Sequence, residues 1–407
     1  MTKADKKTSA SDMTEHFSAM LAPLLDLPPT PGNQRVVYLH TPFCRSHCNY
    51  CPFYRHPAGK LKDFAQTTVK MIRALGQRPF VADSPFSVYF FGGGTPTILA
   101  PDDMGFLLAE LTKNFRPAIG HEFTVESTLT RISPKMLDIL KRNHVTRVSI
   151  GLQTFDENRR KMLGRPATRQ EMVSKIKIAR ESGLETSLDL MYGIPGQMPE
   201  DLAEDVKLAT DLGVDNISQY RLQLFDGAPL KKGIERGRIS AMPSYDQVME
   251  TRLAGAQSAL EAGYSHWNVK NFGKTKTTRC EYTLTPHEDR DMIPLGAGAG
   301  GQIGPKSIFT LPDADDYREA VRKGLYPVFR TGETATKQRV DRKVKGLLES
   351  GEVLLDKLAP DSVSLAYSRL EKLLEKEIVE KKDNAYRLTQ GSFLDYERAL
   401  DFTSSRG

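Results

Sequence analysis

Cysteine and tryptophan are scarce in this chain. Only four cysteines and one tryptophan occur among 407 residues. Three of the four cysteines are clustered, which excludes the evenly spaced framework of a small disulfide-rich secreted domain. Reduced thiols of this kind are typical of the cytoplasm, so we expect a cytoplasmic location.

Long apolar runs and a strong charge excess are also missing. No run approaches the ~20 apolar residues of a membrane-spanning helix, and HFSAMLAPLLDL near the N-terminus is interrupted by Asp26 and lacks a signal-peptide cleavage pattern. The formal net charge is +6, from 57 basic and 51 acidic residues spread along the chain. This charge is too weak and diffuse to predict a nucleic-acid-binding surface. We therefore expect neither a membrane nor a nucleic acid as a partner.

Short β-branched or aromatic runs alternate with longer amphipathic segments from Arg35 onward. Strands are predicted at 35–40, 86–92, 121–127, 147–153, 186–193 and 216–225. Helices are predicted between them at 61–78, 101–115, 133–143, 168–182 and 199–213. Repeated strand–helix units predict an α/β protein with a parallel sheet, and six in succession favour a partial (β/α)6 TIM-like barrel. An open doubly wound sheet is the competing architecture.

Composition divides the chain into three parts. Residues 1–34 are polar and then proline-rich, and we expect an N-terminal arm over the main domain. Residues 35–265 hold the strand–helix repeats of the barrel. Residues 266–407 begin with glycine-rich segments, become helical and charged, and end in a helix followed by a predicted β-hairpin. This order predicts a mostly helical, winged-helix-like C-terminal region, whose charges of alternating sign favour a cap over a DNA-binding role.

Three cysteines lie in one short segment directly after the first predicted strand. Cys44, Cys48 and Cys51 have the spacing C-x-x-x-C-x-x-C in YLHTPFCRSHCNYCPFY. In a parallel barrel, functional groups gather on the loops at the C-terminal ends of the strands. Three thiolates can hold three corners of a [4Fe–4S] cluster and leave the fourth iron open to another molecule. A zinc site with His47 or His56 as fourth ligand is the alternative.

Glycines and polar residues mark the ends of the following strands. GGGTPT (92–97) follows the second strand, Glu126 and Gln153 end the third and fourth, and Asp189 lies in the fifth. Glycines let the backbone approach a ligand closely, and buried polar groups require partners. Together, above a cysteine loop, these residues predict a cofactor site at one end of the barrel.

The cysteine spacing and its aromatic neighbours resemble the radical S-adenosylmethionine (SAM) superfamily. The segments FFGGGTPT, TVEST, SIGLQTF, GRPAT and LDLMYGIPGQ resemble its HemN/HemW branch, and the likeness runs from about residue 35 to 300. It implies a [4Fe–4S] cluster held by Cys44, Cys48 and Cys51. In this superfamily the open iron chelates SAM, and an electron from the cluster cleaves SAM to a 5′-deoxyadenosyl radical.

The same resemblance assigns SAM binding to residues of these motifs. They are Tyr38, Tyr50, Gly93, Gly94, Thr95, Glu126, Gln153, Arg165 and Asp189. Tyr38 and Tyr50 would flank SAM, the glycines and Thr95 would meet its methionine end, and Gln153 and Asp189 would lie on the ribose side. One member of the branch holds two SAM molecules, so some of these residues would serve a second SAM.

The branch includes oxygen-independent coproporphyrinogen dehydrogenase, the haem chaperone HemW, and the anaerobic haem-degrading proteins HutW and ChuW. SHWNVKNFGK and LGAGAGGQIG depart from the HemW-like patterns YEISNFAK and LGIGCGAHG, and the chain resembles the haem-degrading proteins most. This implies a radical SAM methyltransferase that opens the haem ring without oxygen, releases iron and yields a methylated linear tetrapyrrole. Haem would be the substrate, and flavodoxin or ferredoxin the electron donor. A HemW-type chaperone and a coproporphyrinogen dehydrogenase are the alternatives.

The candidate substrate-binding residues are chosen only from their positions in the sequence. Arg221, at the end of the sixth predicted strand, is the candidate catalytic residue. His56, His266 and His287 are candidate axial ligands of haem iron. Cys280 is interpreted as a spare thiol outside the site.

Overall fold

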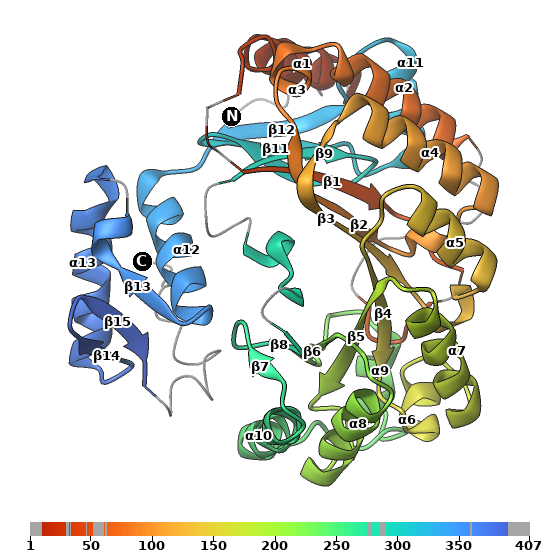
Figure 1. The fold of residues 1–407 in the computed structure, drawn as a ribbon, viewed down its shortest axis with the longest axis vertical. Coiled ribbons are helices and arrows are strands. Elements are labelled where there is room, and N and C mark those ends of the chain that lie inside the picture. Colours follow the sequence, from red (N-terminus) through yellow and green to blue (C-terminus); the bar gives the residue numbers. More distant parts are fainter. Residues whose placement is uncertain are drawn as a thin grey trace, which may run out of the picture.

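Six parallel strands succeed one another in chain order around an open arc. The computed structural model describes residues 10–29, 32, 34–45, 47–51, 61, 63–275, 278–284, 290–358 and 360–389. The six are β1 (Arg35–Thr41), β2 (Phe86–Gly93), β3 (Pro117–Ser127), β4 (Arg147–Gln153), β5 (Glu185–Tyr192) and β6 (Asn216–Arg221). Each pairs in parallel with the next, and helices cover the outer side of the curved sheet (Figure 1). The predicted partial (β/α)6 barrel is confirmed, and the described strands do not close it.

The helices between the strands lie where the apolar periodicity placed them. They are α2 (Phe64–Gly76), α4 (Pro101–Asn114), α5 (Pro134–Arg142), α7 (Arg169–Glu181) and α8 (Pro199–Asp211). Local capping explains the match: the Ser133 side chain accepts a hydrogen bond from the Met136 N–H, and Thr168 and Glu171 form a capping box. Shorter elements in the same part of the chain are α3 (Pro79–Ala82), η2 (Pro96–Ile98), η3 (Leu129–Arg131), α6 (Glu157–Met162) and α9 (Pro229–Glu235). The long helix α10 (Tyr245–Glu261), which the sequence did not predict, packs against α8.

The sheet continues beyond the six parallel strands at both edges. Next to β1 lies the parallel strand β9 (Asp291–Leu295), followed by the antiparallel β10 (Gly300–Ile303), β11 (Lys306–Thr310) and β12 (Val328–Glu333). Next to β6 lie β8 (Asn271–Gly273) and β7 (Ser265–His266), which pair antiparallel. The sheet thus has twelve strands, and the predicted sixth strand, 216–225, ends earlier, at Arg221.

The N-terminal segment packs on the main domain as a helix. α1 (Ala10–Leu25) lies against β12 and close to α11 (Ala314–Arg322). Leu21 and Leu25 are buried in the main hydrophobic core. No helix in the described part of the chain is both long and apolar enough to cross a membrane.

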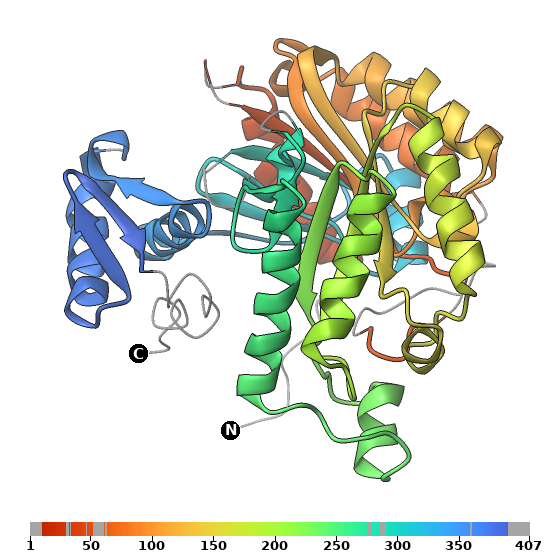
Figure 2. The ribbon, with the colours of Figure 1, turned by 60° about the horizontal axis from the view of Figure 1, so that its bottom comes forward.

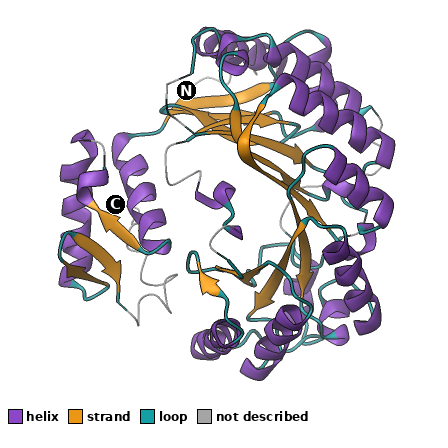
Figure 3. Cartoon of the chain, viewed as in Figure 1, coloured by secondary structure: helices purple, strands orange, loops and turns teal. Residues whose placement is uncertain are grey.

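A second, smaller core forms the C-terminal lobe (Figures 2 and 3). It contains α12 (Thr336–Glu349), β13 (Glu352–Leu354), η6 (Leu355–Lys357), α13 (Pro360–Glu375), β14 (Val379–Lys382) and β15 (Ala385–Leu388). The strands form a separate sheet in the order β13-β15-β14, as in the winged-helix-like region that the sequence predicted. The predicted division at residue 265 falls within β7, and β7 to β12 all belong to the main sheet.

The two lobes meet at the hairpin between β7 and β8. Val269 lies in the core of the C-terminal lobe, and its N–H donates to the Glu349 carbonyl oxygen at 2.9 Å. The Arg252 side chain on α10 donates to the Val269 carbonyl oxygen at 2.8 Å. Residues of the barrel edge are therefore built into the smaller core.

Candidate functional site

Backbone contacts fix the cysteine loop against the end of β2. The Gly94 N–H donates to the Thr41 carbonyl oxygen at 2.7 Å, and the Thr95 N–H donates to that of Phe43 at 2.9 Å. A Cβ atom at position 94 would lie 2.4 Å from the Phe43 oxygen, a distance that no side chain tolerates. Glycine at this position therefore lets GGGTP run directly beside the loop that carries the cysteines.

Two of the cysteines border a cavity of about 450 Å³ at the C-terminal ends of β2, β3 and β4. Its lining includes Cys44, Cys48, Thr95, Arg160 and Arg165, with Arg45 and Arg131. The Nε–H of Arg165 donates to Cys48 Sγ at 3.0 Å, and Cys44 Sγ lies 3.5 Å from Thr95 Oγ1. Cys51 follows in the same turn, with its N–H donating to the Cys48 carbonyl oxygen at 3.2 Å.

The donor set of this cavity fits an iron–sulfur cluster. N–H donors directed at sulfur stabilise clusters and set their potential, and Arg165 supplies one. Arg160 is 3% exposed, and its Nε atom has no hydrogen-bond partner among the described residues. An acceptor in the cavity, such as a cluster sulfide, would satisfy it.

The zinc alternative required His47 or His56 as the fourth ligand. No three His, Cys, Asp or Glu side chains of the described residues are grouped to hold a single metal ion. His47 is exposed, and His56 lies outside the described residues.

A second cavity, of about 220 Å³, lies inside the curved sheet. Tyr38, Glu126 and Asp189 are among the residues that line it. The Glu126 carboxylate accepts a hydrogen bond from the Gly93 N–H at 3.0 Å, and the Ser149 hydroxyl lies 3.4 Å from both Asp189 carboxylate oxygens. The glycine segment therefore contacts this cavity through the hydrogen bond from Gly93 to Glu126.

The pKa values of both carboxyl groups in this cavity are raised, mainly by burial. Burial, and then the nearby Asp189 carboxylate, raise the pKa of Glu126 to about 8, while the hydrogen bond from the Gly93 N–H opposes the shift. Burial also raises the pKa of Asp189 to about 6, against hydrogen bonds from Ser218 and Ser149. Two carboxyl groups that line one cavity favour a ligand that brings positive charge or several N–H and O–H donors. SAM has an ammonium, a sulfonium and a ribose diol.

Of three further residues that the resemblance assigned to SAM, Tyr38 lines the second cavity, whereas Tyr50 and Gln153 line neither. The hydroxyl oxygen of Tyr38 lies 2.8 Å from Nδ1 of His40. Tyr50 packs beside the small apolar cluster that contains Met191. Gln153 is 6% exposed, has a left-handed φ of 70°, and its Oε1 lacks a partner among the described residues. A strained, buried and unsatisfied side chain at a strand end is characteristic of a ligand site.

The substrate-side candidates lie away from both cavities or outside the described residues. The Arg221 guanidinium lies over the ring of Tyr245, 5.4 Å from its centroid, and Arg221 lines neither cavity. The ring of His266 lies against Phe272 at 4.4 Å, and His287 is outside the described residues. Roles for these residues in the reaction stay predictions.

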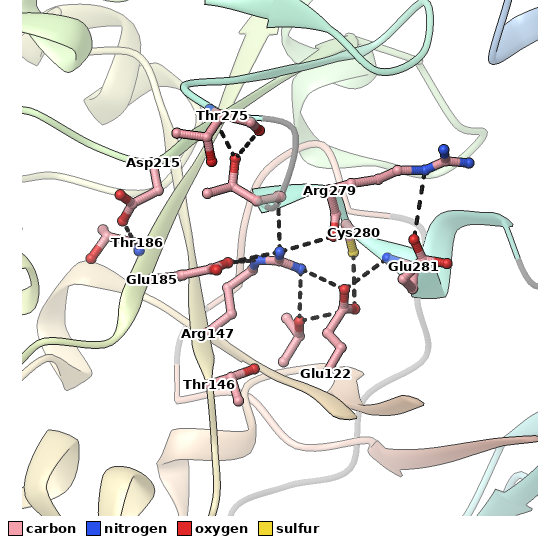
Figure 4. Close-up of polar contacts among 12 residues, drawn as sticks. Glu122, Thr146, Arg147, Glu185, Thr186, Asp215, Thr275, Arg279, Cys280 and Glu281 are labelled. Carbon is pink, nitrogen blue, oxygen red and sulfur yellow. Dashed lines mark hydrogen bonds and ion pairs between the residues drawn. The ribbon is translucent and has the colours of Figure 1, made fainter. Parts of the chain in front are cut away.

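The sequence did not indicate a polar network at the N-terminal ends of the strands (Figure 4). Arg147, with its side chain 4% exposed, pairs with Glu122 at 3.0 Å and Glu185 at 2.8 Å. Cys280 Sγ lies 3.5 Å from the Glu122 carboxylate. Cys280 also lines the second cavity, of about 220 Å³, which is called the barrel cavity below. Cys280 thus lies in the site region rather than apart from it. No local pattern could reveal this, because the partners are far apart in the chain.

Comparisons with known proteins identify a radical SAM domain in this chain. Residues 38–209 match the model of the Radical SAM superfamily. Anaerobilin synthase from Escherichia coli O157:H7 is 28% identical over 342 residues, which cover 82% of this chain and 76% of that protein. The haem chaperone HemW from Bacillus subtilis (strain 168) is 28% identical over 375 residues, covering 88% and 97% respectively.

A solved structure shows the same fold over nearly the whole chain. Coproporphyrinogen III oxidase (HemN) from Escherichia coli, described as a radical SAM enzyme, superposes with a TM-score of 0.80 at 19% identity, covering 96% of this chain and 93% of that one. Proteins of the superfamily use a [4Fe–4S] cluster and SAM as cofactors, as the sequence predicted. Residues 38–209 match a radical SAM domain, and the chain is similar over most of its length to proteins of the HemN/HemW branch.

Proposed function

We propose that this protein is a radical SAM methyltransferase that opens the haem ring without oxygen and releases its iron. The product would be a methylated linear tetrapyrrole, and the setting would be haem utilisation in the cytoplasm. Haem is the substrate, and a low-potential flavodoxin or ferredoxin is the electron donor. A second SAM molecule would serve as the methyl source.

The main observation that supports this function is that two candidate cofactor cavities are neighbours. The cysteine loop and Arg165 border one cavity, and Glu126 and Asp189 line the next, with Gly93 hydrogen-bonded to Glu126 between them. An enzyme that reduces and cleaves a sulfonium needs these two sites side by side. The 28% identity to anaerobilin synthase over 82% of the chain supports haem as the molecule acted on.

Residues of this chain would hold the cluster and SAM next to each other. Cys44, Cys48 and Cys51 would bind the cluster, with the Arg165 N–H on Cys48 Sγ. When bound, the cluster and SAM supply a 5′-deoxyadenosyl radical. Glu126 and Asp189, which line the neighbouring cavity, would accept hydrogen bonds from SAM.

The test is an anaerobic reaction with reductant, SAM and haem, followed by mass spectrometry of the tetrapyrrole. The expected outcome is loss of haem with formation of a methylated open-chain product, 5′-deoxyadenosine and S-adenosylhomocysteine. A protein with Cys48→Ala is the matched control, and it should lose all SAM cleavage. Unchanged haem in the wild-type reaction contradicts the proposed activity.

A haem chaperone is the second candidate, favoured by the alignment with HemW over 97% of that protein's length. A chaperone would bind haem stoichiometrically and return it unchanged. Decarboxylation of a coproporphyrinogen, in the manner of HemN, would instead release carbon dioxide without methyl transfer. The same mass spectra separate the three outcomes.

A further inference from the structure

Residues 278–284 lie inside the concave face of the sheet. Their last part forms the 3₁₀ turn η5 (Glu281–Leu284), which is the teal segment within the arc of Figure 1. Cys280, Tyr282 and Thr283 line the barrel cavity together with Glu126 and Asp189. The segment therefore occupies the lumen beside the predicted SAM carboxylates.

A polar anchor holds the first half of this segment (Figure 4). The Arg147 guanidinium donates to the carbonyl oxygens of Thr278 at 2.9 Å and Arg279 at 3.1 Å. The same guanidinium pairs with Glu122 on β3 and Glu185 on β5. The anchor thus ties the segment to three neighbouring strands at their N-terminal ends.

Glu122 completes the anchor from the other side. Its carboxylate accepts hydrogen bonds from the N–H groups of Glu281 at 2.7 Å and Tyr282 at 3.4 Å, and it lies 3.5 Å from Cys280 Sγ. Burial, and then the Glu122 carboxylate, raise the pKa of the Cys280 thiol well above its ordinary value. In this position Cys280 is a poor nucleophile.

An aromatic stack holds the second half of the segment. The rings of Tyr282 and Phe90 stack with centroids 3.9 Å apart and planes 18° apart. Tyr38 stacks at 5.7 Å from Tyr282, also at 18°. The Tyr282 ring therefore occupies the position that a planar ligand would take on Phe90.

The cavity that remains is too small for a tetrapyrrole. It measures about 220 Å³, whereas pockets for drug-sized ligands span roughly 300–1,000 Å³. Haem is larger than most such ligands. Its ring can approach the carboxylates Glu126 and Asp189 only if the segment leaves the lumen.

We propose that residues 278–284 are a plug that the tetrapyrrole displaces, so that the substrate ring replaces the Tyr282 ring on Phe90. The plug deepens the proposed function and rests on it for the identity of the ligand. Arg147 and Glu122 are positioning residues that hold the closed form. Displacement frees Cys280 from Glu122 and makes its thiol reactive.

Alkylation of Cys280 reports the opening directly. The cluster-loaded protein is treated anaerobically with N-ethylmaleimide, without reductant, and the modified peptides are quantified by mass spectrometry. Haem should speed Cys280 alkylation at least about fivefold. Tyr282→Ala should speed it without haem, and Tyr282→Phe, which keeps the ring, should match the wild type. Glu185→Gln, which loosens the anchor at a half-exposed position, should also speed it.

Haem binding is followed separately through Trp267, the only tryptophan of the chain and a residue of the same cavity. Haem should quench its fluorescence, and Tyr282→Ala should accelerate binding about tenfold relative to Tyr282→Phe. Equal alkylation in all variants, with quenching by haem intact, overturns the plug and leaves the proposed function standing. Loss of haem binding in Tyr282→Ala also overturns it. Faster alkylation in Tyr282→Ala with no response to haem contradicts haem as the ligand, not the plug.

Discussion

The Nε atom of Arg165 lies 3.0 Å from Cys48 Sγ. The same side chain donates to the Gly151 carbonyl oxygen of β4 at 2.9 Å. One guanidinium therefore joins the end of a barrel strand to the loop that carries the predicted cluster ligands. This contact makes the position of the cluster depend on the barrel.

Replacing Arg165 by Gln should lower the reduction potential of the cluster by tens of millivolts. The reason is the loss of an N–H···S hydrogen bond and of a positive charge, both of which favour the reduced cluster. A redox titration followed by electron paramagnetic resonance measures the shift. Arg159→Gln on α6 is the matched control, because Arg159 pairs with Asp156 and Asp201 instead. Equal potentials in the two variants would show that the hydrogen bond has no electronic role.

Replacing Glu126 by Gln should stabilise the SAM-free protein at pH 8 and weaken SAM binding. The folded-state pKa of Glu126, about 8, exceeds its ordinary value, so the folded wild type binds an extra proton between pH 4.5 and 8. Wild-type stability therefore falls relative to the variant as pH rises through this window. Thermal melts should show no difference below pH 4.5 and roughly 3–6 °C at pH 8. A difference that shrinks as pH rises would contradict the burial of this carboxyl group.

Gly94→Ala should destabilise the protein by about 1–3 kcal/mol and reduce its iron content after reconstitution. The added Cβ would meet the Phe43 and Thr41 carbonyl oxygens at 2.4 and 2.8 Å, which forces the cysteine loop away from β2. Gly105→Ala on α4 is the control, because its Cβ meets only Ile139 at 3.6 Å and alanine favours a helix. Urea unfolding and iron analysis distinguish the two, and full iron loading of Gly94→Ala would refute the proposed close approach.

Val269→Asp should detach the C-terminal lobe from the barrel edge. Val269 is 2% exposed and lies in the core of that lobe, where an unpaired carboxylate is costly to bury. Limited proteolysis should cut between the lobes at least about tenfold faster. Lys274→Asp, a change of an exposed residue nearby, should leave the cleavage rate unchanged. Equal rates for both variants would mean that the hairpin does not join the lobes.

The parallel part of the fold could be predicted from sequence because its signals are local. Apolar runs, prolines at helix starts and capping residues such as Ser133 and Thr168 placed the six parallel strands and the five helices between them, although β6 ends earlier than predicted and α10 was missed. Strand-end residues such as Glu126 and Asp189 also followed from position, since the sheet order brings them into one cavity.

The network around Arg147 could not be predicted, because its partners are distant in the chain. Its guanidinium contacts the carbonyl oxygens of Thr278 and Arg279, more than a hundred residues later. Cys280 was interpreted as a spare thiol for the same reason. The antiparallel strands β10–β12 are short, and they join the main sheet through successive pairing with β9, β10 and β11, which local patterns do not encode.

The most direct test of the whole account is electron paramagnetic resonance of the anaerobically reconstituted, reduced protein with and without SAM. An open iron held by no side chain predicts about four irons and four sulfides per chain and a [4Fe–4S]⁺ signal whose g-values change when SAM is added. One zinc per chain, or a cluster signal indifferent to SAM, would contradict it.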